Sequence, residues 1–261
     1  MSNKKKLKPL KKKKIKRRVR KGFLVAVFVL LLSAFSTLSL TVLFPINAVN
    51  VEYKSKLYTP EEIIEASDIE IGDNIILLSE KKVEEKLCKK LPYIGKVELK
   101  KKLDKIVIVP KNTSAKYCIK YKNKYLILDD NFKILEVIKK KNKHLTFLNG
   151  IYVSSGNLGE IAEFSNAEKF ENIKSIYETV SKHGFSINEI DITSQANIEI
   201  IINSKFRVLF GTKENIDQKL AFLVKTINKI ESKNKNDTGT INLKYYEEKS
   251  EAYFKSEEIK F

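Results

Sequence analysis

An uncharged run of 22 residues, Phe23 to Phe44, is the feature that most constrains this 261-residue chain. The 21 residues at the start of the chain hold ten Lys, three Arg and no Asp or Glu. With a rise of about 1.5 Å per residue, an apolar helix of this length measures roughly 33 Å, enough to cross the hydrocarbon core of a bilayer. Pro45 follows the run. The sequence therefore predicts a single transmembrane helix over residues 23–44.

The charges on either side of this run predict its orientation. Between the two prolines that follow it, at positions 45 and 60, the chain holds only two Lys and one Glu. The positive-inside bias then makes residues 1–22 a cytoplasmic tail and exports residues 45–261. A cleaved signal peptide would have a shorter apolar core, roughly 7–15 residues, and a small-residue cleavage site. Leu43-Phe44-Pro45 offers no such site, so a retained anchor is expected.

The net charge of +18 lies mostly in the basic tail. Without those 13 residues, 37 basic residues remain against 32 acidic ones, a net charge of +5. The tail contains no aromatic side chain on which a base could stack. It has the position and composition to fix topology and to attract anionic lipid, at about 1 kcal/mol per basic residue near the surface. Nucleic acid is therefore not an expected partner.

Metal and cofactor chemistry find little support in the sequence. Cys88 and Cys118 are the only cysteines, and with His144 and His183 they show none of the short ligand spacings of a structural zinc site. Cys88 falls on the apolar stripe of a predicted helix, which favours a buried free thiol, although exported cysteines can pair. The chain has no Gly-rich phosphate loop and no recognisable nucleophile motif, so no catalytic residue, cofactor or metal is expected.

Residues 46–112 read as a first exported domain. Asn47–Glu52 alternates polar and apolar residues like a half-buried strand. Thr59 to Glu62 begins a helix, with Thr59 as N-cap, Pro60 as first residue and Glu62 completing a capping box. Ser79 begins a second helix, which Leu91-Pro92 ends. Two strands follow, around Val97–Leu99 and Ile106–Val109, and complete the order β-α-α-β-β.

These segments resemble a POTRA (polypeptide-transport-associated) domain. The resemblance rests on Tyr58-Thr59-Pro60-Glu61-Glu62-Ile63-Ile64, on the turn Gly72-Asp73-Asn74-Ile75, and above all on Leu91-Pro92-Tyr93-Ile94 before the two strands. The position of this unit, directly after one basic-flanked span, resembles the FtsQ/DivIB family of cell-division proteins.

Residues 113–254 read as a second domain, mixed α/β, followed by a C-terminal tail over residues 255–261. A hairpin turns at Asp129-Asp130-Asn131, and the aspartates there are turn formers rather than metal ligands. The other expected elements are helices over 165–183 and 216–230, and strands at 190–192, 198–202, 206–210, 240–246 and 252–255. The helix Asn215-x-x-x-Lys219-Leu220, with the later strand Gly239-Thr240-Ile241-Asn242-Leu243, resembles the β domain of the same family. The expected fold class is thus α+β, with one transmembrane helix.

The resemblance implies a bitopic scaffold of the bacterial cell membrane, acting at the division septum. It implies binding to FtsB/DivIC-like and FtsL-like bitopic proteins outside the membrane, and indirect contact with septal wall-synthesis proteins. In the family these partners bind at the end of the β domain, where Lys244 and Tyr245 match a basic-aromatic pair and Tyr253 matches a frequent aromatic position. Together with Phe254, these residues form the expected partner-binding site.

Two alternatives remain open from the sequence. A membrane-anchored wall-modifying enzyme would bring catalytic residues together in a cleft. A POTRA-bearing transport accessory usually carries several such units or a barrel, whereas this sequence contains one unit.

Overall fold

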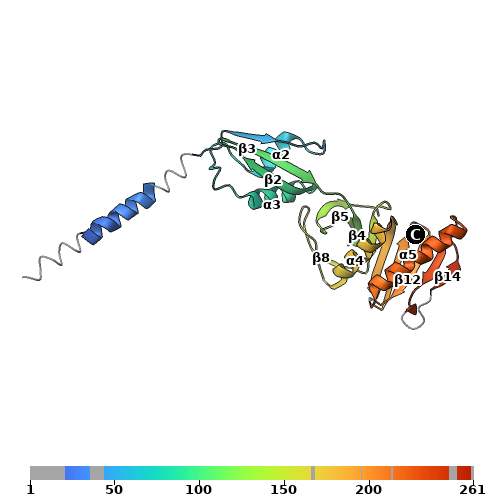
Figure 1. Cartoon of the computed structure of the whole chain (residues 1–261). Helices are drawn as coiled ribbons and strands as arrows, with labels where there is room; N and C mark the ends of the chain where they lie inside the picture. Colours follow the sequence, from blue (N-terminus) through green and yellow to red (C-terminus); the bar gives the residue numbers. More distant parts are fainter. Residues whose placement is uncertain are drawn as a thin grey trace, which may run out of the picture. The chain divides into compact units, whose positions relative to one another are not determined.

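The computed structural model describes residues 21–35, 44–165, 168–194, 196–212, 214–246 and 252–259 (Figure 1). Its contacts divide the chain into two compact units. The first comprises residues 1–83 and 98–109, and the second comprises residues 84–97 and 110–261. Contacts therefore assign residues 84–97, which the sequence pattern places in the first exported domain, to the second unit.

The predicted transmembrane segment is described in part. Residues 21–35 are helical, whereas residues 36–43 lie outside the described residues. Within the part of the chain that the structure describes, no helix is both long and apolar enough to cross a membrane.

The elements that follow have the predicted β-α-α-β-β order. They are β1 (Ala48–Val51), α2 (Pro60–Ser67), α3 (Glu80–Lys90), β2 (Ile94–Lys101) and β3 (Lys105–Asn112). The strands form one sheet in the order β1-β3-β2, in which β1 is parallel to β3, with Ala48 opposite Lys105. Within the first unit, Ile46, Ile63 and Ile106 are fully buried.

The start of α2 confirms the predicted capping box. The Glu62 N–H donates to the Thr59 hydroxyl at 3.2 Å, and the Thr59 N–H donates to the Glu62 carboxylate at 2.7 Å. Pro60 occupies the first helical turn, where its missing N–H costs nothing. The helix ends at Asp68, whose backbone is left-handed with φ 57°. Local chemistry alone therefore fixes both ends of this short helix.

Residues 84–97 share several contacts with the rest of the second unit. The buried Lys133 ammonium donates to the Ile94 carbonyl at 2.5 Å, and the Thr113 N–H donates to the Tyr93 carbonyl at 2.9 Å. Lys89 pairs with Glu160 at 2.6 Å. The Tyr93 hydroxyl donates to the Glu136 carboxylate. These contacts explain why the end of α3 and the start of β2 group with the second unit.

A nine-stranded mixed sheet is the main element of the second unit. Its strands are β4 (Tyr117–Tyr121), β5 (Lys124–Leu128), β6 (Ile134–Ile138), β7 (Thr146–Asn149), β10 (Ile187–Ser194), β11 (Asn197–Ile202), β12 (Phe206–Gly211), β13 (Gly239–Asn242) and β14 (Tyr253–Ser256). They are ordered β14-β13-β12-β11-β10-β7-β4-β5-β6. β8 (Val153–Ser155) and β9 (Glu163–Phe164) form a separate ribbon. The predicted hairpin around Asp129 is confirmed as the β5–β6 pair.

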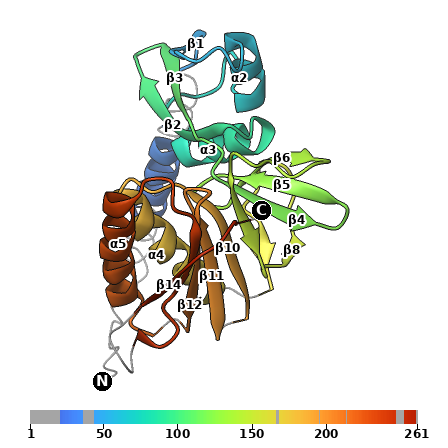
Figure 2. The same cartoon turned by 90° about the vertical axis from the view of Figure 1, so that its right-hand side faces the viewer.

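Two helices cover one face of this sheet, α4 (Glu168–Lys182) and α5 (Ile216–Lys233) (Figure 2). Their apolar side chains join the core at helical spacing: Ile173, Ile176 and Val180 from α4, and Leu220, Leu223 and Ile227 from α5. Burial of this kind contributes about 25 cal/mol per Å² of apolar surface removed from water. The predicted helices thus form because each has one apolar face that only the sheet can cover.

Both cysteines are free thiols in the second unit. Cys118 is buried on β4, and Cys88 is half-buried on α3. Burial raises the pKa of each thiol, because a thiolate is poorly solvated away from water. Cys88 is a free thiol as expected, although it is half-buried rather than buried, and the two residues do not pair.

Candidate binding surface at the edge of the sheet

The nine-stranded sheet ends in β14, a strand of four residues. It pairs antiparallel with β13, placing Tyr253 opposite Asn242, Phe254 opposite Ile241 and Lys255 opposite Thr240. Among the described residues, no strand pairs with the other side of β14. A strand in this position presents main-chain donors and acceptors to which a strand of another protein can add.

The hydrogen bonds around β13 show which backbone groups of β14 point outward. The N–H groups of Gly239 and Leu243 donate to carbonyls of Lys205 and Leu209, on the β12 side. The main-chain groups of Thr240 and Asn242 therefore point the other way, toward β14. The Glu257 N–H, which donates to the carbonyl of Thr238 just before β13, follows the same alternation. By the same alternation, the main-chain groups of Phe254 and Ser256 point away from the sheet.

The side chains of β14 alternate between two faces. Phe254 faces the core, where its ring meets Phe206 with centroids 6.3 Å apart in an edge-to-face arrangement. Tyr253 lies on the opposite face and is half exposed. Of these two predicted partner-binding residues, Tyr253 is half exposed at the surface, whereas Phe254 packs the edge strand on the core.

Lys244 and Tyr245 lie in a turn, not in the strand expected to continue to Tyr246. β13 ends at Asn242, whose side-chain carbonyl accepts the Lys244 N–H at 3.0 Å and bends the chain. The Tyr246 ring then packs against Phe222 of α5, with centroids 5.1 Å apart. The phenol ring of Tyr245 is half exposed as a result.

Gly211 allows this turn to approach the end of β12. It has φ +77°, and a β-carbon there would lie 3.2 Å from the Lys244 Cα. Tertiary contact thus stops the strand early, whereas the alternation of its residues predicts a longer one.

The far end of β14 is held by a polar cluster around Glu257. Its carboxylate accepts hydrogen bonds from the Thr240 hydroxyl at 2.5 Å and from the Lys255 ammonium at 2.9 Å. These two donors, with Thr240 first, lower the pKa of the Glu257 carboxyl. The ionised carboxylate therefore favours the paired edge strand, and this contribution is lost only as the pH falls through the lowered pKa.

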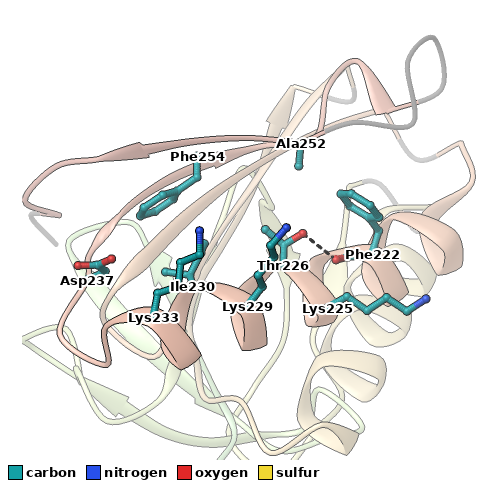
Figure 3. Close-up of a pocket in the computed structure, with 9 residues that line it drawn as sticks. All are labelled: Phe222, Lys225, Thr226, Lys229, Ile230, Lys233, Asp237, Ala252 and Phe254. Carbon is teal, nitrogen blue, oxygen red and sulfur yellow. Dashed lines mark hydrogen bonds between the residues drawn. The ribbon is translucent and has the colours of Figure 1, made fainter.

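A groove of about 400 Å³ separates β14 from α5 (Figure 3). Its apolar lining comes from Phe222, Ile230, Ala252 and Phe254, and its polar lining comes from Lys225, Thr226, Lys229, Lys233 and Asp237. Figure 3 shows the Phe254 ring directed toward α5, and Lys225 extending away from β14. The three lysines repeat every four residues, so they lie on one face of α5. That spacing is visible in the sequence, but nothing in the sequence places it beside an edge strand.

The chemistry of this surface is that of binding. It combines an open strand edge, two exposed tyrosines and a groove with an excess of positive charge. Among the residues that the structure describes, no three His, Cys, Asp or Glu side chains form a group able to hold a metal ion. The predicted residues Lys244, Tyr245, Tyr253 and Phe254 all lie along β14 and the turn after β13, while the groove lysines were not predicted.

Comparison with known proteins agrees with this architecture. Residues 44–109 match the family model of the POTRA domain, FtsQ-type. The cell division protein DivIB of Clostridium botulinum (strain Hall) is 28% identical over 242 residues, covering 90% of this chain and 92% of that protein. DivIB of Clostridium tetani is 32% identical over 182 residues, covering 67% of each chain.

The chain has a POTRA unit followed by a mixed sheet with an open edge, and its relatives are cell division proteins. Together these findings place it in the class of POTRA-bearing cell-division proteins. The chain belongs to the FtsQ/DivIB family.

Truncation of Tyr253 and Phe254, which are neighbours on β14, should have unequal effects on the free energy of unfolding. Phe254→Ala should lower the free energy of unfolding by about 2 kcal/mol or more, because it removes a ring packed on Phe206. Tyr253→Ala should change it by about 0.5 kcal/mol or less, because that ring is half exposed. Urea unfolding of the full chain in detergent, followed by circular dichroism, measures both. Equal losses would contradict the assignment of the two faces.

Proposed function

We propose that this protein is a bitopic division scaffold, held in the cell membrane by residues 23–44 with residues 45–261 outside the cytoplasm. Its task is to bind FtsB/DivIC-like and FtsL-like proteins at the septum and thereby to assemble wall-synthesis proteins. Binding, without catalysis, is the mechanism.

The open edge of β14 is the observation that carries this proposal. A partner segment that adds beside β14 gains main-chain hydrogen bonds from the outward groups of Phe254 and Ser256. Tyr245, in the turn after β13, and Tyr253, on β14, are both half exposed, and tyrosine is among the residues that most often dominate binding energy at interfaces. Lys244 adds a positive charge beside Tyr245.

The groove behind β14 supports the same proposal. The ammonium groups of Lys225, Lys229 and Lys233 outnumber the one carboxylate, Asp237, among its lining residues. A partner with acidic residues next to its added strand would complement this charge and associate faster as a result. Membrane tethering of both proteins raises their effective concentration, so a modest affinity at this edge is sufficient.

The sequence at the N-terminus supports the membrane tether. The uncharged run over residues 23–44 has the length of a spanning helix, and the 13 basic residues before it favour a cytoplasmic tail. The exported location of residues 45–261 follows from this orientation.

Lys244→Glu combined with Tyr245→Ala should weaken binding to the two bitopic partners about tenfold or more, because a hot-spot ring and its charged neighbour are both lost. The measurement is capture of the purified partners by the full chain in nanodiscs. A matched control is Lys124→Glu with Tyr152→Ala, which makes the same chemical changes on exposed residues of other elements. Undiminished capture by the first variant, with its unfolding unchanged, would exclude this surface.

A further inference from the structure

We propose that the first unit has a lipid-contact site, formed by four exposed apolar side chains, Ile71, Ile76, Leu77 and Leu103, that lie at the end where the chain leaves the predicted membrane span. The inference rests on the membrane tether of the proposed function and adds a second, peripheral contact with the outer leaflet.

Hydrogen bonds hold the turn over residues 71–77 against the first residues after the span. The Ile75 N–H donates to the Phe44 carbonyl at 3.0 Å, and the Ile46 N–H donates to the Asp73 carbonyl at 2.8 Å. The Gly72 N–H donates to the Ile46 carbonyl at 2.9 Å, which closes the pairing. Phe44 is the last residue of the predicted span, so this turn is pinned to the point at which the chain emerges.

The β2–β3 hairpin turn lies at the same end. The Asn47 N–H donates to the Asp104 carbonyl at 2.8 Å, and β1 runs from Ala48 beside Lys105 away from this end. The Lys101 ammonium donates to the Leu78 carbonyl at 2.6 Å, which ties the hairpin to the end of the 71–77 turn. Two loops that are distant in the sequence therefore adjoin the same short segment, residues 44–47.

Both loops carry apolar side chains that the unit does not bury. Ile71 is 66% exposed, Ile76 49%, Leu77 69% and Leu103 84%. In the described part of the first unit from residue 44 onward, the only other large apolar side chain with such exposure is Leu57. Leu57 follows the distal end of β1, so four of five exposed apolar side chains gather at the end pinned to the span.

Lipid is the occupant that this position favours. Contiguous exposed apolar groups mark interaction sites, and here the loop backbone is bonded to the residue that ends the predicted span. Exposed Lys101 and Lys102 lie on the hairpin, with Asp73 and Asp104 nearby, so positive and negative charges are mixed. Apolar insertion at the headgroup boundary, rather than attraction of anionic lipid, is then the main contribution to binding.

Tryptophan substitution tests the site, because the chain contains no Trp, so each variant has a single Trp whose emission can be excited selectively over that of tyrosine. The full chain is reconstituted into phosphatidylethanolamine–phosphatidylglycerol vesicles as Leu77→Trp, Leu103→Trp or Leu57→Trp. Trp at the interface of a bilayer lies among the headgroups, so brominated lipid should lower emission of the first two variants about twofold or more. Emission of the Leu57→Trp control, at the opposite end of β1, should not change.

Flotation of the vesicles separates the possible results. If the chain floats with the vesicles and brominated lipid quenches the Trp emission of all three variants to the same small extent, the lipid-contact site is excluded. The membrane tether would still stand. If the chain does not float, the tether of the proposed function fails, and the inference fails with it. Emission of Leu77→Trp that changes only when a bitopic partner is added would assign the patch to protein and overturn the proposal.

Discussion

Gly150→Ala should destabilise the second unit by more than about 4 kcal/mol, whereas Gly184→Ala should cost about 1 kcal/mol. Both glycines have left-handed backbones, with φ +77° and +79°. A β-carbon at Gly150 would lie 2.1 Å from the Thr193 nitrogen and 2.3 Å from the Thr193 Cα, which are both backbone atoms. A β-carbon at Gly184 would meet no atom within 4 Å.

The large effect at Gly150 follows from what surrounds it. Gly150 follows β7, which is parallel to β10, with Asn149 opposite Asp191. The buried Lys169 ammonium from α4 donates to the Gly150 carbonyl at 2.7 Å and to the Ile192 carbonyl at 2.9 Å. Movement of the β7 end to relieve the clash would leave this buried charge without its acceptors, at a further cost.

Urea unfolding of the full chain in detergent measures both glycine variants under the same conditions. Gly184→Ala serves as the control for left-handed backbone strain. It places a β-carbon on a backbone of the same conformation, but with no neighbouring atom to clash with. A loss for Gly150→Ala within about 1 kcal/mol of the loss for Gly184→Ala would show that the β7–β10 junction can relax, and would contradict the prediction.

Ser256→Pro should abolish capture of the bitopic partners while leaving the fold intact. The Ser256 N–H points away from β13, so proline removes no main-chain hydrogen bond of the sheet and costs only the long bond, 3.4 Å, from the Ser256 hydroxyl to the Thr238 carbonyl. Proline is tolerated at such positions of edge strands. An incoming strand, however, loses one main-chain donor and meets the proline ring. Capture by the full chain in nanodiscs should fall about a hundredfold or more if strand addition is the binding mode.

Lys255→Pro is the matched control for this variant. It places the same ring one residue earlier, where the N–H points toward Thr240 of β13. That variant should detach β14 and lower the free energy of unfolding by about 3 kcal/mol. If Ser256→Pro captured both partners normally, strand addition would be excluded, although side-chain contacts through Tyr245 and Tyr253 would remain testable by the Lys244 and Tyr245 double variant.

Elements governed by local chemistry were predictable from the sequence. The capping box of α2 depends on Thr59 and Glu62, three residues apart, and the structure reproduces it. The apolar faces of α4 and α5 repeat with helical period, and the β5–β6 hairpin turns at the predicted aspartates. In each case the interacting residues are neighbours along the chain, so their spacing determines the structure.

The details of the binding surface depend on contacts between distant residues. β13 stops at Asn242 because the turn after it packs against Gly211, about thirty residues earlier. Phe254 faces inward because Phe206 and Ile241 are present to receive it. The lysines of α5 line a groove beside the edge strand only because α5 lies behind β14.

The sequence by itself determined the predicted anchor, the order of helices and strands apart from the β8–β9 ribbon, and the resemblance to the family, because charge, hydrophobic period and capping act over a few residues. Only the tertiary structure decided which strand is the open edge, which aromatic rings are exposed on it, and which apolar loops gather beside the end of the predicted span. Those features arise from strand order and from packing between segments far apart in the chain, and no local pattern encodes them.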